Sequence, residues 1–341
     1  MRFFACLLFL SQICSYSEAQ TLGGSATYNF LKMQWVPQAS ALGGRNVSTF
    51  NNDVGLFNDN PALLRYQHHG NISANFAAIA PTVNELFGAG AYHHENWNTT
   101  FAAGIAHLLY GNETQTDAAG NVMGTFTAFD QMVSLSAART YGERWFYGAT
   151  LKFINSRYGP YNSIGMASDI GLNYYDEENM LQVGFAARNM GFQIKQYTNQ
   201  GEDLPFDLLI GLTKQLEKAP IKLSLTAQRL HQFDLLYPDE NFDTDNYGTV
   251  LRNGIGTKIL SHFIAGADVL VGEKIVLTLG YNMLRRKELQ IRNLANGLTG
   301  FGYGIRLNLN SLQFQYARTH YQSTYSQHQV SFVYKLFDYE K

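Results

Sequence analysis

Apolar and polar residues alternate at a period of two along most of this chain. In the segment 220–229, Ile221, Leu223, Leu225 and Ala227 alternate with Lys222, Ser224, Thr226 and Gln228. The segments 181–188 and 301–309 repeat the same alternation. Successive residues of a strand point to opposite faces, so this pattern predicts β-strands with one apolar and one polar face.

The alternation also predicts where the strands lie. Candidate strands occur near 71–80, 86–95, 100–108, 130–139, 145–155, 164–175, 180–190, 206–215, 220–229, 263–271, 275–284, 300–309, 312–321 and 328–337. A further candidate, 251–259, would make the number odd, whereas single-chain bacterial barrels have an even number. Its Leu251, Ile255 and Ile259 have the spacing of a short amphipathic helix instead. About fourteen strands in up-and-down order remain.

Apolar faces could pack together in a soluble β-sandwich or face lipid around a closed barrel. The segments run to about ten residues, the length that crosses a bilayer at a tilt, whereas typical strands have about five or six. Tyrosine and tryptophan stand near segment ends, as at Trp97, Trp145 and Tyr281. No run of about 18 apolar residues follows residue 19, so no helix is expected to span a membrane. We therefore predict an all-β fold, a transmembrane antiparallel β-barrel of about 14 strands.

The connections divide into two sets. Short turns near 96–99, 140–144, 176–179, 216–219, 272–274 and 310–311 alternate with long loops near 109–129, 191–205, 230–262 and 285–299. Outer-membrane barrels have short periplasmic turns and longer extracellular loops. The sequence thus predicts a barrel over 67–341 in the outer membrane of a Gram-negative bacterium.

The first nineteen residues have the pattern of a secretory signal peptide. Arg2 precedes a short apolar core, Phe3 to Leu10, and Ser17-Glu18-Ala19 offers a small-residue cleavage site. Both cysteines, Cys6 and Cys14, fall within 1–19, so no disulfide is expected in the mature chain. Cys14 as a lipoprotein cysteine is the alternative, but the residues before it lack the small side chains of such a site.

Residues 20–66 precede the first strand. This segment is too apolar for a disordered tail and too short and glycine-broken for a domain. The lumen of a fourteen-stranded barrel is wider than wall side chains can fill, so we predict that 20–66 forms a hatch inside it. Asn58, Asp59, Asn60 and Pro61 would form the turn from lumen to wall, because Asn and Asp close turns and Pro61 lies before the strand ladder.

The composition and charge of the chain argue against nucleic-acid binding. Charged residues make up 15% of the chain, against about a quarter in soluble domains. Removing 1–19 takes away one base, Arg2, and one acid, Glu18, so 24 basic and 26 acidic residues leave the net charge at −2. This near-neutral balance gives no electrostatic basis for binding nucleic acid.

Charged loop residues are the candidate partner-binding sites. The acidic loop holds Tyr237, Asp239, Glu240, Asp243 and Asp245, and the basic cluster holds Arg285, Arg286 and Arg292. Such loops on one rim could dock a surface protein, and the basic cluster could contact lipopolysaccharide phosphates. Solvated loop charge with ordinary lipopolysaccharide contact remains the alternative.

Catalytic and metal sites have little support in the sequence. The spacing from Asp239 to Asp245 resembles the start of a calcium loop, but Thr244 replaces the turn glycine and Val250 the bidentate glutamate. A hydrolase would need a nucleophile near a base, for which His107 with Ser134 or Ser136 is conceivable, yet no nucleophile elbow accompanies them. We expect no enzyme activity, no metal and no cofactor.

Several motifs resemble known barrels. The glycine-rich Ala41–Gly44 and the motif Asn60–Leu64 before the first strand are similar to the N-terminal pattern of FadL-like outer-membrane proteins. Together with 24–31, 58–64 and 279–289, they resemble the PorQ-type barrels of the type IX secretion system of Bacteroidota.

The resemblance implies a function. A PorQ-type barrel transports nothing by itself and holds a PorZ-like surface protein of the attachment complex, with PorU held by the sister barrel PorV. That complex joins secreted cargo to anionic lipopolysaccharide. The alternative is a FadL-like transporter for hydrophobic small molecules, with an apolar pocket beside the hatch and a side opening at a glycine such as Gly184, Gly254 or Gly302.

Overall fold

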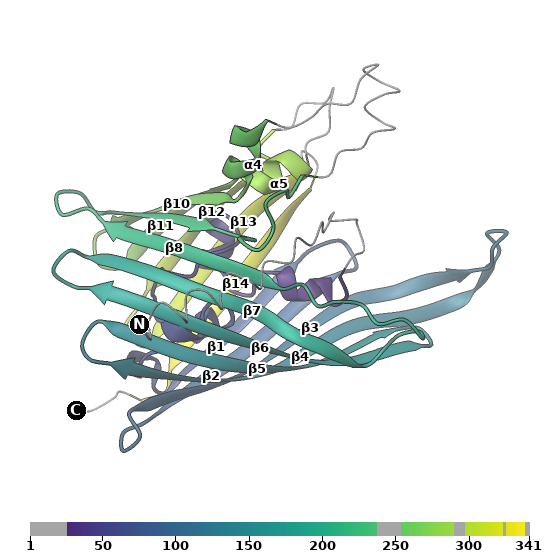
Figure 1. Ribbon diagram of the computed structural model, residues 1–341, viewed down its shortest axis with the longest axis horizontal. Coiled ribbons are helices and arrows are strands. Elements are labelled where there is room, and N and C mark those ends of the chain that lie inside the picture. Colours follow the sequence, from purple (N-terminus) through teal and green to yellow (C-terminus); the bar gives the residue numbers. More distant parts are fainter. Residues whose placement is uncertain (1–25, 237–253, 290–296, 323–324, 338–341) are drawn as a thin grey trace, which may run out of the picture.

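The computed structural model describes residues 26–236, 254–289, 297–322 and 325–337. Fourteen strands in these residues close into one antiparallel barrel, in which each strand pairs with its sequence neighbours and β1 pairs with β14 (Figure 1). The predicted fold class, strand number and up-and-down order are therefore confirmed. The strands are β1 (Asn71–Ala78), β2 (Asn84–His94), β3 (Thr99–Thr116), β4 (Val122–Tyr141), β5 (Trp145–Tyr158), β6 (Tyr161–Asp176), β7 (Leu181–Lys195), β8 (Asp207–Gln215), β9 (Ile221–Ala227), β10 (Phe263–Val271), β11 (Ile275–Asn282), β12 (Phe301–Asn308), β13 (Leu312–Gln322) and β14 (Tyr325–Lys335).

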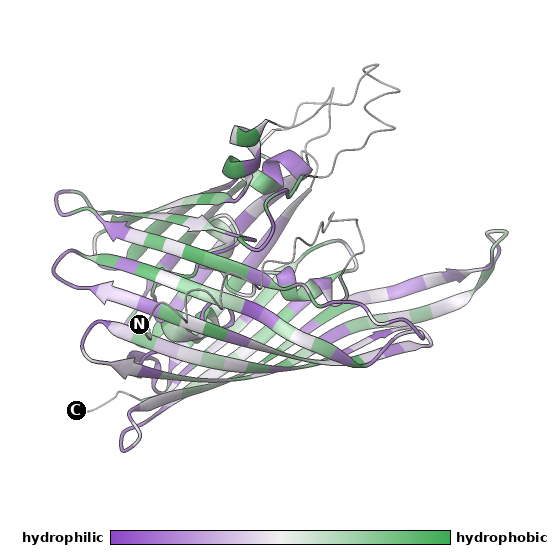
Figure 2. Ribbon diagram, in the orientation of Figure 1, coloured by the Kyte–Doolittle hydropathy of each residue, from purple (hydrophilic) through white to green (hydrophobic). Residues whose placement is uncertain are grey.

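The two faces of the barrel differ as the alternation requires. Ile72 and Phe76 of β1 are exposed on the outside, whereas Ser73 and Asn75 between them are buried inside. Figure 2 shows the same alternation of apolar and polar residues along the neighbouring strands. Closure satisfies every ladder hydrogen bond without an edge, which is the condition for a sheet to span a bilayer. The protein is thus a barrel of the outer membrane of a Gram-negative bacterium.

Helices are few and short in the described residues. The outer end carries α4 (Ile255–Ser261) and α5 (Met283–Glu288). α4 overlaps the segment 251–259, whose assignment to a helix rather than a strand is confirmed where it is described. None of the helices in the described ranges has the length and hydropathy of a membrane span.

The prediction of a long loop at 109–129 is wrong. β3 and β4 continue through it and leave only a turn at 117–121, where the Asp117 carboxylate accepts from the backbone N–H of Ala119 (2.9 Å) and Asn121 (2.8 Å). This hairpin projects well beyond the rest of the barrel (Figure 1). Away from lipid a strand needs no apolar face, so the alternation that marks the spanning part is lost here while the backbone pairing persists.

The other predicted long loops are described in part. The loop 191–205 is shortened because β7 runs to Lys195. The loops 230–262 and 285–299 contain α4 and the end of α5, and their residues 237–253 and 290–296 lie outside the described ranges. The predicted signal peptide, 1–19, lies outside them as well.

Residues 26–70, called the N-terminal segment below, occupy the inside of the barrel. They form short turns: η1 (Asn29–Lys32), α2 (Pro37–Ala41), η2 (Val54–Asn58), η3 (Pro61–Leu63) and η4 (Tyr66–His68). Their side chains are mostly buried, and the turns appear in purple within the barrel wall in Figure 1. Because the N-terminal segment fills part of the lumen, it determines which parts of the lumen remain open.

Candidate functional site in the barrel lumen

The wall makes room for the N-terminal segment with glycines. A Cβ on Gly184 of β7 would overlap the carbonyl oxygen of Val47, and one on Gly280 of β11 would overlap the backbone of Leu42. Wall and segment therefore meet backbone to backbone at these points. In the described structure Gly184 is a contact point for the segment. It does not form the side opening for which the sequence makes it a candidate.

Polar side chains tie the segment to several strands. Gln38 donates to Asp268 of β10 (3.0 Å), and Gln315 of β13 donates to Asp53 (2.8 Å). Ser331 of β14 also donates to Asp53 (3.2 Å). Hydrogen bonds on several sides of the lumen hold the segment in one position, because moving it would leave buried polar groups without partners.

The four residues of the predicted turn lie inside the barrel. Asp59 follows η2, and Asn60 caps η3 by accepting from the backbone N–H of Ala62 (2.9 Å). Asn60 also donates to the carbonyl oxygens of Val47 (2.8 Å) and Leu172 (3.2 Å), and Pro61 is the first residue of η3. Asn58 and Pro61 are buried too. η4 still separates this turn from β1, so the chain reaches the wall later than we predicted.

Buried ion pairs join the segment to the wall on the β7 and β8 side. The Arg188 guanidinium donates to Asp59 with 3.2 Å between Nη1 and Oδ1, and Arg45 lies 3.9 Å from Asp207. Asp59 also accepts from the Gln34 amide (2.9 Å). Charges removed from water need such partners, because an isolated buried charge costs several kcal/mol, as an order of magnitude.

An aromatic cluster packs between the segment and the wall formed by β2 to β6. Its centre is Trp35, with ring centroids 6.3 Å from Phe30 and 5.8 Å from Phe87. Tyr28 extends it toward the outer end, where ring contacts of 6.3, 5.8 and 5.5 Å link Tyr28, Tyr197, Tyr158 and Tyr110 in turn.

The hydroxyl groups of Tyr110, Tyr158 and Tyr197 converge on one buried carboxylate, whereas that of Tyr28 bonds the Ser163 hydroxyl (2.5 Å). Tyr110 and Tyr158 donate to Asp130 Oδ2 at 2.6 and 2.9 Å, and Ser156 donates to its other oxygen. Tyr197 donates to Ser156 in turn. The polar ends are thus satisfied within the wall, which fixes the rings in place.

A cavity of about 300 Å³ opens at the outer end, and we call it the outer cleft. It lies between the segment, the outer ends of β8, β9 and β11, and α5. Lys32, Arg45, Arg229 and Arg285 line it with Asp207 and Glu288. Burial and the neighbouring Arg229 and Arg45 lower the pKa of Lys32, whereas burial raises the pKa of Glu288.

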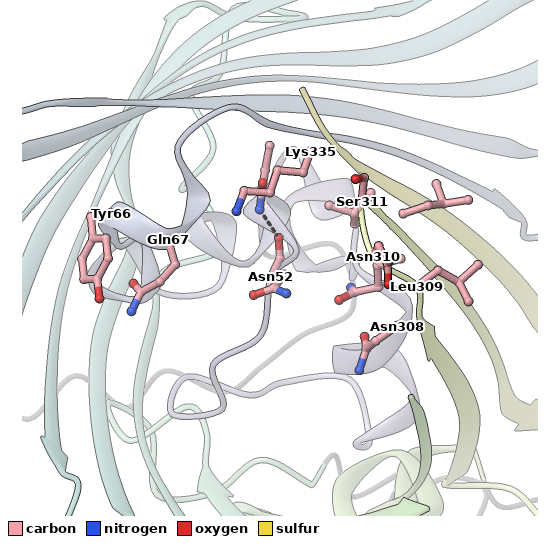
Figure 3. Close-up of a pocket in the computed structure, with 12 residues that line it drawn as sticks. Asn52, Tyr66, Gln67, Asn308, Leu309, Asn310, Ser311 and Lys335 are labelled. Carbon is pink, nitrogen blue, oxygen red and sulfur yellow. Dashed lines mark hydrogen bonds between the residues drawn. The ribbon is translucent and has the colours of Figure 1, made fainter. Parts of the chain in front are cut away.

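A second cavity, of about 410 Å³, lies at the opposite end. Figure 3 shows side chains of the N-terminal segment on one side of it and the turn between β12 and β13 on the other. Its lining is rich in amides and includes Asn52, Tyr66, Gln67, Asn71, Asn308, Asn310, Ser311, Gln313 and Lys335. By the usual orientation of such barrels this is the periplasmic end.

The structure describes two of the predicted docking residues. Arg285 and Arg286 lie on α5, where Arg285 lines the outer cleft and Arg286 donates to the carbonyl oxygens of Gly297 (3.0 Å) and Thr299 (3.4 Å). The remaining predicted docking residues lie outside the described ranges; they are Tyr237, Asp239, Glu240, Asp243, Asp245 and Arg292. The calcium-like spacing in that loop lies outside them too.

Sequence reasoning missed most of the outer cleft. Lys32 and Arg45 come from the predicted hatch, and Arg229 follows β9. The sequence contains one signal for such a site. A basic residue in a segment expected inside the lumen needs an acidic or anionic partner. The sequence alone could not show which bases share one cavity.

The strand register separates His107 from Ser134 and Ser136, the residues considered for a hydrolase. Gly104 pairs with Ser134 on the lumen side, whereas His107 pairs with Gln131 on the opposite face. His107 therefore cannot reach Ser134 or Ser136 across the strand. Among the described residues no group of three or more His, Cys, Asp or Glu is placed to hold a metal ion.

Comparisons with known proteins agree with this architecture. No protein-family model matches the chain, and no curated protein matches it. Among solved structures, the monoaromatic hydrocarbon channel CymD matches with a TM-score of 0.51 and 14% identity, over 89% of this chain and 98% of that chain.

Two further structures are similar. A deltaS2 mutant of the monoaromatic hydrocarbon channel TodX has a TM-score of 0.50 and 14% identity, over 89% of this chain and 98% of that one. The toluene transporter TbuX of Ralstonia pickettii has a TM-score of 0.49 and 12% identity, over 89% and 97%. CymD and TodX show that the chain has the fold of FadL-like outer-membrane barrels, as the sequence predicted, and at this identity they show the fold alone.

Proposed function

We propose that this barrel carries small hydrophobic molecules across the outer membrane. The observation that carries the proposal is the aromatic run from Tyr110 at the outer end to Trp35 beside the N-terminal segment. With their hydroxyl groups held by Asp130 and Ser156, Tyr110, Tyr158 and Tyr197 offer ring faces to an apolar solute. The names of CymD and TodX as hydrocarbon channels support this function by analogy of fold.

Passage along this route requires the N-terminal segment to move. Phe30, Trp35 and Phe57 are buried in the aromatic cluster, so a solute must displace part of it. A solute of similar size and polarity can replace those contacts, because apolar burial is not directional. The barrel then passes apolar molecules while its polar contacts continue to occlude the rest of the lumen.

Trp35 provides the test. The chain has three tryptophans, and the other two, Trp97 and Trp145, are exposed, so Trp97→Phe with Trp145→Phe leaves Trp35 as the reporter. Titration of the detergent-solubilised barrel with toluene, and separately with a medium-chain fatty acid, is expected to change its emission. Proteoliposomes should take up the same probes faster than empty liposomes. Unchanged emission together with equal uptake would exclude transport of these classes.

Anchoring of a surface partner is the second candidate. In this reading the barrel holds a PorZ-like protein of the type IX attachment complex of Bacteroidota, works indirectly with PorU and PorV, and contacts lipopolysaccharide. The motif resemblance supports it. So do exposed apolar side chains on the outer elements, Val122 and Met123 near the projecting turn (71% and 67%) and Ile255 of α4 (69%). Contiguous patches of exposed apolar side chains mark protein interaction sites, and α4 adds Ile259 and Leu260 to Ile255.

The two candidates predict different results. The named structural neighbours favour transport, and anchoring has its support from the resemblance and the outer elements. A pull-down from solubilised outer membrane should recover a surface protein if anchoring holds, and Val122→Ser with Ile255→Ser should release it without changing uptake. Recovery of no surface protein would remove the anchoring candidate.

A further inference from the structure

Four basic side chains face the outer cleft against two acidic ones. Lys32, Arg45, Arg229 and Arg285 carry four positive charges, and Asp207 and Glu288 carry two negative charges, so the described lining has a surplus of two. The acids are already engaged, Asp207 with Arg45 (3.9 Å) and Glu288 with Arg229 (3.6 Å). Lys32 and Arg285 have no ion-pair partner among the described residues. The surplus therefore faces the cavity.

Two guanidinium groups of the lining also have donors without a partner. Nη1 of Arg45 and Nη1 of Arg285 are buried and have no hydrogen-bond partner in the described residues. Arg45 is 7% exposed, and its Nη2 already donates to the carbonyl oxygen of Lys32 at 2.5 Å. Water could accept from these donors, but it cannot neutralise the surplus charge.

The position of Arg285 is well defined. Its guanidinium lies 4.7 Å from the ring centroid of Tyr321, and the backbone N–H of Arg285 is capped by Asn282 (3.0 Å). Gly44 leaves space for it, since a Cβ at that residue would collide with Arg285 Nη2. A fixed planar guanidinium with free donors is the arrangement that binds phosphate oxygens in pairs.

We propose that the outer cleft binds a phosphate monoester from the outer side. The two negative charges of a phosphate monoester near neutral pH match the surplus. A volume of about 300 Å³ admits such a group with a small organic substituent. The phosphate accepts from Arg285 and Arg45, and Lys32 supplies the further charge. The site does not depend on whether the barrel transports or anchors.

Inorganic phosphate is the first probe. Calorimetric titration of the detergent-solubilised full-length barrel should give a dissociation constant of about 1 mM or tighter. Arg285→Gln and Lys32→Met should each weaken binding by about tenfold or more, since each removes a charged partner. Arg286→Gln is the matched control, because it removes the same charge from the same helix but Arg286 does not line the cleft. Heat-modifiable gel mobility shows that each variant is folded.

The source of the phosphate is tested separately. Glycerol 1-phosphate represents a soluble monoester, and purified lipopolysaccharide represents a lipid-borne one. Displacement of bound phosphate by only one of them in the wild type identifies the source. Equal phosphate binding by the wild type and the Lys32→Met, Arg285→Gln double variant would overturn the proposal. An equal loss in Arg286→Gln would do the same.

Discussion

Asp59 of the N-terminal segment and Arg188 of β7 form an ion pair of 3.2 Å between Oδ1 and Nη1, with side chains 3% and 1% exposed. The two residues are 129 positions apart in the chain. The pair therefore closes a long loop and fixes the segment against one side of the wall. Its loss should release the segment without opening the barrel, because no ladder hydrogen bond depends on it.

Arg188→Met should loosen the N-terminal segment, because it leaves the Asp59 carboxylate buried without its cation. Breaking one partner of such a pair costs about 3–5 kcal/mol. We expect more frequent channel openings in planar bilayers and faster proteolysis of 26–66. The Asp59→Asn, Arg188→Met double variant should recover part of the loss, since no charge is then stranded. Arg144→Met is the control, because its pair with Asp176 lies at an exposed turn.

Gly184→Ala should also displace the segment. The added Cβ would overlap the carbonyl oxygen of Val47, and backbone on both sides cannot give way without a shift. Single-channel conductance should rise relative to the wild type. Gly88→Ala is the matched control, because a Cβ there meets only Ser73 O at 3.9 Å. Equal conductance of the two variants would mean that the segment does not occlude the lumen at this point.

The sequence revealed the wall better than its contents. Lipid imposes alternation on every spanning strand, so residues such as Leu223 and Leu225 identify strands one by one and their number follows. The outer part of β3 and β4 has no lipid to face, so its sequence lacks the alternation and predicts a loop. Its pairing, for example Glu113 with Phe126, rests on backbone hydrogen bonds that composition does not reveal.

The lumen could be foreseen only in outline. A segment of the right length and composition indicated that something fills the barrel, but Asp59 and Arg188 are paired by a fold that neither residue reveals alone. The outer cleft combines Lys32, Arg45 and Arg285 from opposite ends of the chain. Only the register of the closed barrel brings these three residues together. The basic cluster predicted from the sequence therefore includes one of them, Arg285.

Anion binding in the outer cleft should weaken as pH rises. The pKa of Glu288 is raised by burial, so acidification neutralises it early and increases the positive surplus. The pKa of Lys32 is lowered by burial and by Arg229 and Arg45, so alkalinity removes its charge early. Both effects favour binding at low pH. The other charged groups facing the cleft are Arg45, Asp207, Arg229 and Arg285.

Sulfate is the probe for this pH dependence, because it keeps its two charges across the range whereas phosphate gains a proton near pH 6. The raised pKa of Glu288 and the lowered pKa of Lys32 both lie between the ordinary values of about 4.3 and 10.4, so calorimetry is carried out across that range. Lys32→Met should flatten the alkaline limb, and Glu288→Gln should flatten the acidic limb. Affinity that rises with pH in the wild type would contradict the assignment of charges in the cleft.

His68 should make the folded N-terminal segment acid-sensitive. Burial lowers the pKa of His68 to about 4, and its ring bonds the carbonyl oxygen of Asn51 (2.9 Å) while Nδ1 accepts from the backbone N–H of Arg65 (3.1 Å). The unfolded state binds a proton on this ring near pH 6.5, so stability is complete above that value. It falls as pH drops toward 4, by about 2 kcal/mol at pH 5.

Protease resistance of residues 26–66 at pH 7 and pH 5 measures this loss while the strands remain folded. Resistance should decrease at the lower pH in the wild type. His68→Gln keeps a polar side chain and cannot gain the proton, so its resistance should be lower at pH 7 but change less between the two values. Because the barrel wall does not depend on His68, heat-modifiable mobility should be the same for both proteins at both pH values. An equal pH response in the variant would show that protonation of His68 is not the cause of the acid sensitivity.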